Sequence, residues 1–476
     1  MKQVAERRLV HSGRRLLFAL AVVALAPLGV VTAQGYELSG HELANARRYV
    51  QNFRATPDGR RVVYSLGRTA VAERAALFSV STPGNEAPLE LSRGTPTFVS
   101  EFQLSPDGSR VVYRADEASF ELFELYSARC DGGGNPFVLS QDGCAGDVHS
   151  FVITPDGSRV LYLRDLSQGD ARLFGVAIDG SSLPELLSKS ADHVADFVLS
   201  PDGSRVVYRT GSPDASALLS VPTDRSFAPV TLNEPPPMRG MLGYRISPDG
   251  AHVVYTALQG SARRLFSAPI DRALPPAALD GPGGSVAGHF ELTSDGQAAV
   301  YLADEDVPAT FELYRVPLDG SQAPLRISGA LVAGGDVERA ALLTLDAAGR
   351  GFRLTLDGTR VVYVADADSD EVLELYAVPL DGSRAALRLN DTFVAGGNVR
   401  FGPEVPPFEL TRGGQRVVYV ADGDADEVFE LYSAPVDASA SPVELNRSLD
   451  GFVRRDVADF RLTDDGSRVL YRANQE

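Results

Sequence analysis

The strongest constraint on the fold of this chain is a phrase that recurs along nearly its whole length. The phrase reads aromatic, x, Leu, Ser or Thr, then Pro-Asp-Gly-Ser-Arg and Val-Val-Tyr, with local variation. Its leading aromatic residues are Phe53, Phe102, Phe151, Phe197, Tyr244, Phe290, Phe352, Phe408 and Phe460. Successive copies begin 46 residues (Phe151 to Phe197) to 62 residues (Phe290 to Phe352) apart. A period of this size is typical of a repeat architecture.

The second unit shows how each repeat divides into short β-strands, which we expect at 102–105, 111–113, 124–127 and 137–140. A Pro-Asp-Gly turn follows the first strand, because Pro presets φ and Gly accepts a positive φ. The second strand, Val-Val-Tyr, is β-branched and aromatic. Four strands per unit, repeated many times, predict an all-β chain that forms a single β-propeller. A β-helix is the alternative, but its repeats are usually shorter and lack paired hairpin turns.

Strand counting predicts nine four-stranded blades, the last of them composite. The unit that begins at Phe460 has only two strands before the sequence ends, and residues 36–39 resemble the fourth strand of other units. Pairing the two ends in one blade would remove exposed strand edges. We therefore expect a signal peptide at 1–33, an N-terminal closing segment at 34–52 and the propeller at 53–476. An eight-bladed propeller is the alternative.

The repeat also resembles a known family. Pro-Asp-Gly turns followed by Ser-Arg-Val-Val-Tyr, and later Glu-Leu-Tyr-Ser-Ala-Pro, are similar to the TolB-like family of WD-like propeller repeats over nearly all of 53–476. The resemblance implies the propeller fold. It implies no single activity, because the same repeat serves in periplasmic scaffolds, in receptors and in the non-catalytic halves of peptidases.

The N-terminus predicts export. Four arginines between Arg7 and Arg15 precede an apolar run from Leu16 to Val31, and a small-residue cleavage site ends at Ala33. The mature protein would be periplasmic or secreted. No later apolar stretch is long enough to cross a membrane, so we expect no membrane span after signal cleavage.

The net charge of −18 limits the partners. Nucleic-acid binding needs a basic stripe that neutralises phosphates, and the sequence has none, so we expect no nucleic acid. We predict a monomer that acts as a non-catalytic, protein-binding scaffold in the cell envelope. Its partner would be an envelope or extracellular protein, and an acidic surface favours a basic one.

Two repeated sets of charged residues have structural interpretations. The Asp and Arg of the Pro-Asp-Gly-Ser-Arg phrase recur in most units, so we expect the Asp to cap the turn and the Arg to pair with it. The residue after the leading aromatic alternates in sign along the later units. Because first strands lie nearest the axis of a propeller, we expect these side chains to form a partial ring of charges: Arg245, Glu291, Arg353, Glu409 and Arg461.

The alternative function is a propeller enzyme of the lyase or lactonase type. In a propeller, the loops that join a fourth strand to the next first strand share one face with the hairpins between second and third strands. We call this the upper face, and the Pro-Asp-Gly turns then lie on the lower face. His149, His193 and His289 precede or begin first strands, which places them near the upper mouth of the channel. They are the candidate catalytic residues, provided that they converge.

The acidic hairpins of two late units are candidate calcium ligands, because hard cations bind several carboxylates. The candidate ligands are Asp366, Asp368, Asp370, Asp422, Asp424 and Asp426. Glu371 and Glu427 stand where the calcium-loop motif needs glycine, so the motif itself does not match. A solvated hairpin is the alternative to a weak Ca²⁺ site, and no other cofactor is expected.

The upper face of the late units is the predicted binding surface, because function should lie where repeats differ. The inter-blade loops lengthen at 329–351, 391–407 and 447–459 and mix apolar residues with Gly-Gly pairs and arginine. Such a mixture suits a protein interface. The candidate binding residues are Leu331, Val332, Phe393, Val394, Phe401 and Phe452.

The two cysteines, Cys130 and Cys144, leave a disulfide open. Export permits a bridge, and an even number of cysteines favours one. However, a straight hairpin would place the first on the lower side of its blade and the second on the upper side, too far apart to join.

Overall fold

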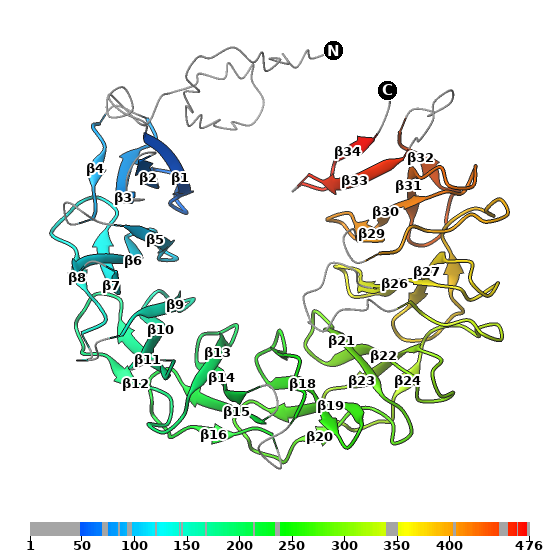
Figure 1. Cartoon of the computed structure of the whole chain (residues 1–476), viewed down its shortest axis with the longest axis horizontal. Coiled ribbons are helices and arrows are strands. Elements are labelled where there is room, and N and C mark those ends of the chain that lie inside the picture. Colours follow the sequence, from blue (N-terminus) through cyan, green and yellow to red (C-terminus); the bar gives the residue numbers. More distant parts are fainter. Residues whose placement is uncertain are drawn as a thin grey trace. The chain divides into compact units, whose positions relative to one another are not determined.

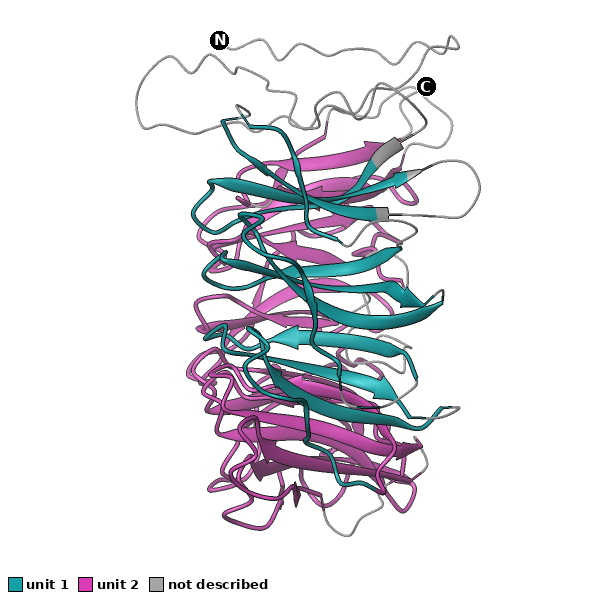
Figure 2. Cartoon of the chain, turned by 90° about the vertical axis from the view of Figure 1, so that its left-hand side faces the viewer, with its two compact units in different colours: residues 1–190 teal, residues 191–476 magenta. Residues whose placement is uncertain are grey.

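A computed structural model describes the chain from residue 48 to residue 473. The description omits 69–74, 84–85, 93–97, 120, 142, 144–145, 167–168, 213–214, 234–238, 339–350, 403–405, 447–455 and 464. The chain divides into two compact units, residues 1–190 and 191–476, which Figure 2 colours separately and which are described one at a time. In the described part of the chain the regular elements are β-strands, and no helix there is long and apolar enough to span a bilayer.

The first unit contains three four-stranded antiparallel sheets, which we call blades 1 to 3. Blade 1 is β1 (Arg48–Ala55), β2 (Arg61–Arg68), β3 (Ala75–Ser81) and β4 (Leu89–Glu90); blade 2 is β5 (Val99–Leu104), β6 (Arg110–Ser119), β7 (Leu122–Arg129) and β8 (Phe137–Val138); blade 3 is β9 (Val148–Ile153), β10 (Arg159–Asp165), β11 (Ala171–Ala177) and β12 (Glu185–Leu186).

The second unit contains five four-stranded sheets, blades 4 to 8, and one two-stranded sheet, blade 9. Blade 4 is β13 (Val194–Leu199), β14 (Arg205–Ser212), β15 (Ala215–Pro222) and β16 (Val230–Thr231); blade 5 is β17 (Tyr244–Ile246), β18 (His252–Gln259), β19 (Ala262–Pro269) and β20 (Ala277–Ala278); blade 6 is β21 (Val286–Leu292), β22 (Ala298–Ala303), β23 (Glu312–Pro317) and β24 (Leu325–Arg326); blade 7 is β25 (Phe352–Leu354), β26 (Arg360–Ala365), β27 (Glu374–Pro379) and β28 (Leu387–Arg388); blade 8 is β29 (Phe408–Leu410), β30 (Arg416–Ala421), β31 (Glu430–Pro435) and β32 (Val443–Glu444); blade 9 is β33 (Val457–Leu462) and β34 (Val469–Ala473).

These sheets confirm the predicted propeller of four-stranded blades. Within every four-stranded sheet the strands pair in sequence order, so each repeat forms one antiparallel meander (Figure 1). The expected two-stranded last unit is also present, as β33 and β34. Residues 36–39, which we expect to complete that blade, lie outside the described residues, as does the predicted signal peptide. β1 begins at Arg48, so blade 1 takes up the end of the predicted closing segment.

The second strand of each blade forms its hydrophobic centre. In β26, five consecutive residues are buried, because neighbouring sheets cover both faces of the strand. Tyr363 of β26 lies opposite Tyr376 of β27, and their rings stack with centroids 5.6 Å apart. One core cluster contains Val300 of blade 6 together with Val361 and Tyr363 of blade 7. The core of the second unit is thus a series of layers between successive blades.

The fourth strand of every complete blade has only two residues, and a side chain continues its pairing. In blade 2 the predicted strand at 137–140 shortens to Phe137–Val138. The hydroxyl of Ser140 then accepts a hydrogen bond from the backbone N–H of Leu125 at 2.9 Å. The residues that act in this way are Ser92, Ser140, Ser188, Asn233, Asp280, Ser328, Asn390 and Asn446. Each satisfies a buried N–H group that a longer strand would otherwise pair.

The aspartate of each Pro-Asp-Gly phrase caps its turn, as expected. In blade 2 the Ser105 hydroxyl and the Ser109 N–H both donate to Asp107 Oδ1. The partner of the motif arginine differs from the expected aspartate, because Arg110 donates to the hydroxyl of Ser127 at 3.2 Å. The motif arginines of three further blades also donate to a serine of the third strand: Arg61, Arg205 and Arg416.

These capped turns predict a dependence of stability on pH. The hydrogen bonds from Ser105 and Ser109 lower the pKa of Asp107 from its ordinary value of 3.8, and hydrogen bonds from the equivalent residues of blades 3 and 4 lower the pKa of Asp156 and Asp202. A depressed folded-state pKa stabilises the fold above the unfolded-state value, and this contribution disappears as pH falls through the folded value. We expect the melting temperature to be insensitive to pH between 7 and about 5 and to fall steeply below pH 3.8. Asp107→Asn should weaken that acid dependence, and an unchanged profile would contradict the cap.

The disulfide left open by the sequence does not involve Cys130 in this structure, where that residue is a free thiol. Cys130 lies in the core between blades 1 and 2, and burial raises the pKa of its thiol to about 12. A thiol with such a pKa is almost entirely protonated at neutral pH and is therefore a weak nucleophile. Cys144 lies outside the described residues.

Candidate acidic site on the upper face of blades 6 to 8

The hairpins between the second and third strands of blades 7 and 8 each begin with a buried aspartate. Asp366 accepts hydrogen bonds from the backbone N–H groups of Asp336 and Glu371, and Asp422 accepts them from Asn398 and Glu427. One N–H group in each pair belongs to the hairpin itself, and the other belongs to the preceding inter-blade loop. These two aspartates therefore hold the loops in place.

The inter-blade loops lie against these hairpins, as the definition of the upper face requires. Val332 N donates to Ala367 O at 3.1 Å, and Val394 N donates to Gly423 O at 3.0 Å. The Gly-Gly pairs allow the close approach. A Cβ added at Gly334 would lie 2.8 Å from the carboxylate of Asp370, and φ at this residue is +92°. The predicted upper face is thus present in blades 7 and 8.

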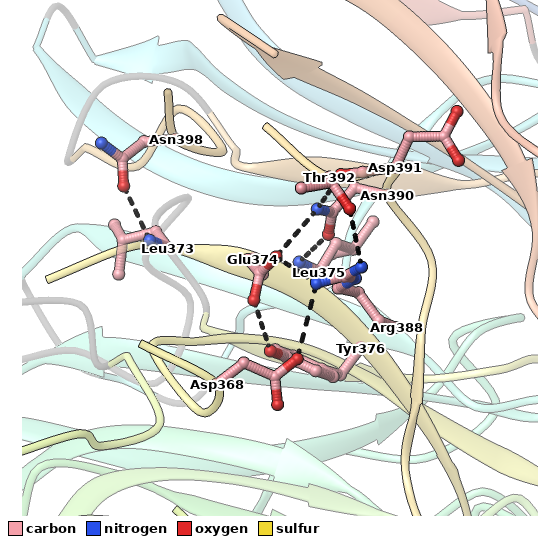
Figure 3. Close-up of polar contacts among 10 residues, drawn as sticks. All are labelled: Asp368, Leu373, Glu374, Leu375, Tyr376, Arg388, Asn390, Asp391, Thr392 and Asn398. Atoms are coloured by element: carbon pink, nitrogen blue, oxygen red, sulfur yellow. Dashed lines mark hydrogen bonds and ion pairs between the residues drawn. The ribbon is translucent and has the colours of Figure 1, made fainter. Parts of the chain in front are cut away.

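A charged network covers the outer end of the hairpin of blade 7 (Figure 3). Arg388 Nη1 lies 3.0 Å from Glu374 Oε1 and 3.6 Å from Asp368 Oδ2. The hydroxyl of Tyr376 donates to Glu374 Oε2 at 2.8 Å, and the Asn390 amide also donates to Glu374. Burial and the neighbouring Glu374 raise the pKa of Tyr376, so its hydroxyl stays protonated and serves as a donor.

Blade 6 repeats the contacts among the arginine, the tyrosine and the two acids, with Ser328 in the position of Asn390. Arg326 Nη1 lies 3.0 Å from Glu312 Oε1 and 3.4 Å from Asp306 Oδ2. The hydroxyl of Tyr314 donates to Glu312 Oε2 at 3.2 Å. Both glutamates are almost fully buried, with side-chain exposures of 5% and 6% in blades 6 and 7. The arginine neutralises a carboxylate that the fold withdraws from water.

Blade 8 keeps the acids and the tyrosine but reverses the charge of the arginine. Glu444 occupies the position of Arg326 and Arg388, since it lies opposite Tyr432 in the same strand register. The carboxylate oxygens of Asp424, Glu430 and Glu444 all lie within 4.8 Å of one another. Among the described residues, this is the group of three His, Cys, Asp or Glu side chains that converges closely enough to hold a metal ion.

The predicted calcium ligands divide between different roles. Asp366 and Asp422 bind backbone N–H groups, and Asp368 pairs with Arg388. Asp370 and Asp426 are exposed and lie beside Gly334 and Gly396 of the inter-blade loops. The converging group contains Asp424 from the predicted set together with Glu430 and Glu444, which lie outside that set.

The predicted apolar binding residues also separate into two kinds. Leu331, Phe393 and Phe401 are partly buried and pack on the cores between blades. Val332 and Val394 are exposed, at 36% and 40%. Phe452 lies outside the described residues. In each of the two loops, therefore, the first apolar residue anchors the loop and the second faces solvent.

The three candidate histidines lie in different surroundings. His149 Nε2 lies 2.8 Å from Asp165 Oδ2 in blade 3. In the second unit, His193 is exposed, whereas the ring of His289 packs against Phe352 with centroids 5.1 Å apart. The converging group found among the described residues contains none of these histidines.

Two members of the predicted charge ring bind the backbone of the following blade. Glu291 of β21 accepts a hydrogen bond from Leu354 N of β25 at 2.8 Å. Glu409 of β29 accepts one from Leu462 N of β33 at 3.1 Å. These glutamates join the first strands of successive blades, a role that the charge-ring interpretation did not include.

The acidic group has a signal in the sequence that appears only when the repeats are aligned. A charged residue stands 14 positions after the Glu of the Glu-Leu-Tyr phrase in three successive blades, and it is Arg326, Arg388 and then Glu444. Aligning the repeats column by column would have exposed this reversal. The role of the residue at this position depends on the pairing of the third and fourth strands, because that pairing brings its side chain beside the buried glutamate.

Comparisons with known proteins find solved structures of low similarity to this chain. No family model and no curated protein matches it. Among solved structures, a putative TolB from Agrobacterium tumefaciens is 20% identical over 63% of this chain and 94% of its own, with a TM-score of 0.29. An oligogalacturonate lyase in complex with manganese is 16% identical over 70% of this chain and 89% of its own, with a TM-score of 0.35.

A puromycin-hydrolyzing peptidase from Mycobacterium tuberculosis is 15% identical over 75% of this chain, with a TM-score of 0.35. This chain spans only 56% of the length of that peptidase. Since the activities named for these proteins differ, the similarities leave the activity of this chain open. Its own four-stranded antiparallel meanders make it a β-propeller, and its Pro-Asp-Gly repeats resemble those of TolB-like proteins.

Proposed function

We propose that the chain is an exported, non-catalytic β-propeller that binds a basic protein through the upper-face loops of blades 7 and 8. The observation that carries this proposal is a repeated surface element. Each of the two inter-blade loops carries an exposed valine, Val332 or Val394, and contacts an exposed acidic hairpin. An apolar contact flanked by carboxylates suits a partner that presents apolar and basic side chains together.

The contacts that hold these loops in place support a preformed binding surface. Asp366 and Asp422 bind both the loop and the hairpin, and Leu331 and Phe393 anchor the loops in the cores. A surface held in this way loses little conformational freedom when a partner binds. The export signal predicted at the N-terminus would direct the chain to a partner in the envelope or outside the cell.

The double variant Val332→Asp and Val394→Asp should reduce capture of the partner at least tenfold. Each change removes an apolar contact and places a carboxylate where an apolar side chain of the partner packs, so that burial would leave that charge unpaired. The measurement is recovery from envelope extract with mass spectrometry, comparing wild type and variant at 50 and 300 mM salt. Capture by the wild type should also weaken at the higher salt, because exposed charges are screened.

The matched control is Leu183→Asp, which changes an apolar residue of blade 3 that is 74% exposed. This variant should capture the same proteins as the wild type. Equal recovery by the double variant, with an unchanged thermal melt, would refute binding at these loops.

The alternative function, a propeller enzyme of the lyase or lactonase type, is favoured by one contact. The carboxylate of Asp165 lies 2.8 Å from His149 Nε2 and could orient that imidazole as a general base. An activity of the purified chain that is lost in His149→Ala and kept in His193→Ala would favour the enzyme over the scaffold.

A further inference from the structure

The lower face of blades 6 and 7 carries a hollow of about 570 Å³ that gathers three arginines. Arg315 comes from the third strand of blade 6, Arg360 begins the second strand of blade 7, and Arg384 lies in the turn between β27 and β28. Asp381 is the carboxylate that the described residues contribute to the lining. Three positive charges and one negative charge thus line this hollow, although the chain as a whole has a net charge of −18.

Arg360 lacks the acceptor that its equivalents have. In four other blades the motif arginine donates to a serine of the third strand, and this serine lies in register with the second residue after the arginine. The residue in that register of blade 7 is Ala377, opposite Val362, and it has no hydroxyl group. Arg360 Nη1 is buried and has no hydrogen-bond partner among the described residues. Because a buried donor without an acceptor is costly, an acceptor from outside the chain would stabilise this guanidinium.

Blade 6 differs from those four blades at the same two positions. Ala298 replaces the motif arginine, and Arg315 stands in the register of the third-strand serine, opposite Val300. Arg315 therefore lines the same hollow as Arg360. Within the described ranges of the second unit, neither of these arginines nor Arg384 forms an ion pair. The departures from the repeat thus collect cations that no ion pair of the described chain neutralises.

Four aspartates near the hollow are occupied with their own turns. They interact electrostatically with Arg315 or Arg360, and they are Asp295, Asp357, Asp381 and Asp437. Each accepts a hydrogen bond from the backbone N–H group two residues later in its turn. They reduce the positive charge around the hollow, but they leave guanidinium N–H groups available to an anion.

We propose that Arg315, Arg360 and Arg384 bind the phosphoryl group of a small phosphomonoester. A phosphoryl group carries a charge of about −1.5 to −2 at neutral pH and three acceptor oxygens, which matches an excess of two positive charges and three guanidiniums. A carboxylate has a single charge and two oxygens, and it matches the lining less well. Charge-assisted bonds between guanidinium and phosphate are short and often bidentate, so three arginines can also fix the orientation of the group.

The rest of the hollow suits a hydroxylated ligand body. Its volume falls within the range of about 300–1,000 Å³ that is typical of small-molecule sites. Thr359 and Ser383 line it beside the arginines. The hydroxyl of Thr359 donates to Asp357 at 2.9 Å, so its oxygen can still accept a hydrogen bond from a hydroxyl group of the ligand.

This site is independent of the partner surface proposed above. The hollow lies among the lower-face turns, whereas Val332 and Val394 belong to the upper-face loops. Failure of partner capture would leave phosphate binding unaffected, and failure of phosphate binding would leave partner capture unaffected.

Calorimetric titration of the full chain at low salt tests the site, with inorganic phosphate and glycerol 3-phosphate as probes. The wild type should bind one equivalent of either probe at this site. Arg360→Gln and Arg315→Ser should each weaken binding by at least about tenfold, because each removes a charge-assisted donor. Arg472→Gln is the control, since it removes one positive charge from a side chain that is 73% exposed in blade 9. It should change the affinity by less than about twofold, because solvent screens that charge.

Ala377→Ser tests the argument from the repeat while it keeps all three arginines. The new hydroxyl would accept a hydrogen bond from Arg360, as Ser433 does from Arg416 in blade 8. The affinity for phosphate should fall, though less than in Arg360→Gln, and the melting temperature should not fall. The variant should fold, since four other blades carry serine in this register. An unchanged affinity would show that the missing serine plays no part, and it would overturn the argument.

Three further results would overturn the proposal. The first is no binding of either probe by the wild type at millimolar concentration, and the second is equal affinity in the wild type and Arg360→Gln. The third is acetate binding as tightly as phosphate, which would identify the site as one for carboxylates. If Arg360→Gln fails to fold, Arg384→Gln serves in its place, because Arg384 is exposed and blade 6 has Gln322 at the same turn position.

Discussion

Replacing Arg164 with methionine should lower the free energy of unfolding by about 3–5 kcal/mol, since it removes one partner of a buried ion pair. Arg164 of β10 is 1% exposed and is among the largest fully buried side chains. Its guanidinium donates to the backbone carbonyls of Ser140 and Gly146 and to Glu124 of the neighbouring blade. Methionine keeps most of the aliphatic part of the arginine side chain. The loss of unfolding free energy therefore comes chiefly from the charge and its hydrogen bonds.

The control for Arg164 is an exposed pair of the same kind. Arg472 Nη2 lies 2.7 Å from Asp459 Oδ2 in blade 9, but the arginine side chain is 73% exposed. Arg472→Met should cost no more than about 1 kcal/mol, because solvent screens the pair. Adding Glu124→Gln to Arg164→Met should recover part of the loss, since it removes the unpaired carboxylate. A urea-unfolding loss for Arg164→Met as small as that of Arg472→Met would contradict the prediction.

The second large effect is expected at the core between blades 6 and 7. Tyr363→Ala should lower the free energy of unfolding by about 3–5 kcal/mol, as other buried aromatic truncations do. Tyr363 is fully buried, stacks on Tyr376 and belongs to the same cluster as Val300 of blade 6. The cavity would remove contacts on both faces of β26, because successive sheets cover that strand on each side.

Hydrogen exchange is the suitable measurement for Tyr363→Ala, because repeat proteins open locally as well as globally. Protection should fall first in β25 to β27 and in the facing strands of blade 6. Tyr363→Phe keeps the ring and should stay within about 1 kcal/mol of the wild type, a typical limit for shape-conserving changes. If Tyr363→Ala lowered protection from exchange equally across the whole second unit, that result would contradict the layered core.

The acidic hairpins illustrate how one repeated sequence supplies different functions at different positions. In blades 7 and 8 the aspartate directly after the second strand accepts hydrogen bonds from backbone N–H groups and so holds the loops in place. The next aspartate faces an arginine in blade 7 and two carboxylates in blade 8. Charge alone therefore did not distinguish the residues that hold the loops from those that could hold an ion.

The sequence by itself determined the units of this fold. Each unit carries its own turn residues and its own β-branched strand, and such signals act over a few neighbouring residues. The Pro-Asp-Gly turns, the eight complete meanders and the two-stranded last unit were predictable for that reason. The two-residue fourth strands were not, because Ser140 and its equivalents replace a strand residue with a side chain, and this exchange is decided by pairing with the third strand.

Only the tertiary structure decided which side chains meet and which face water. Phe393 and Val394 are neighbours in sequence and equally apolar, yet packing against the core of blades 7 and 8 partly buries the first and leaves the second exposed. Glu430 and Glu444 are 14 residues apart and meet because β31 pairs with β32 in a register that sets Tyr432 opposite Glu444. A local pattern specifies a strand, but strand register and blade packing determine the surroundings of each charge.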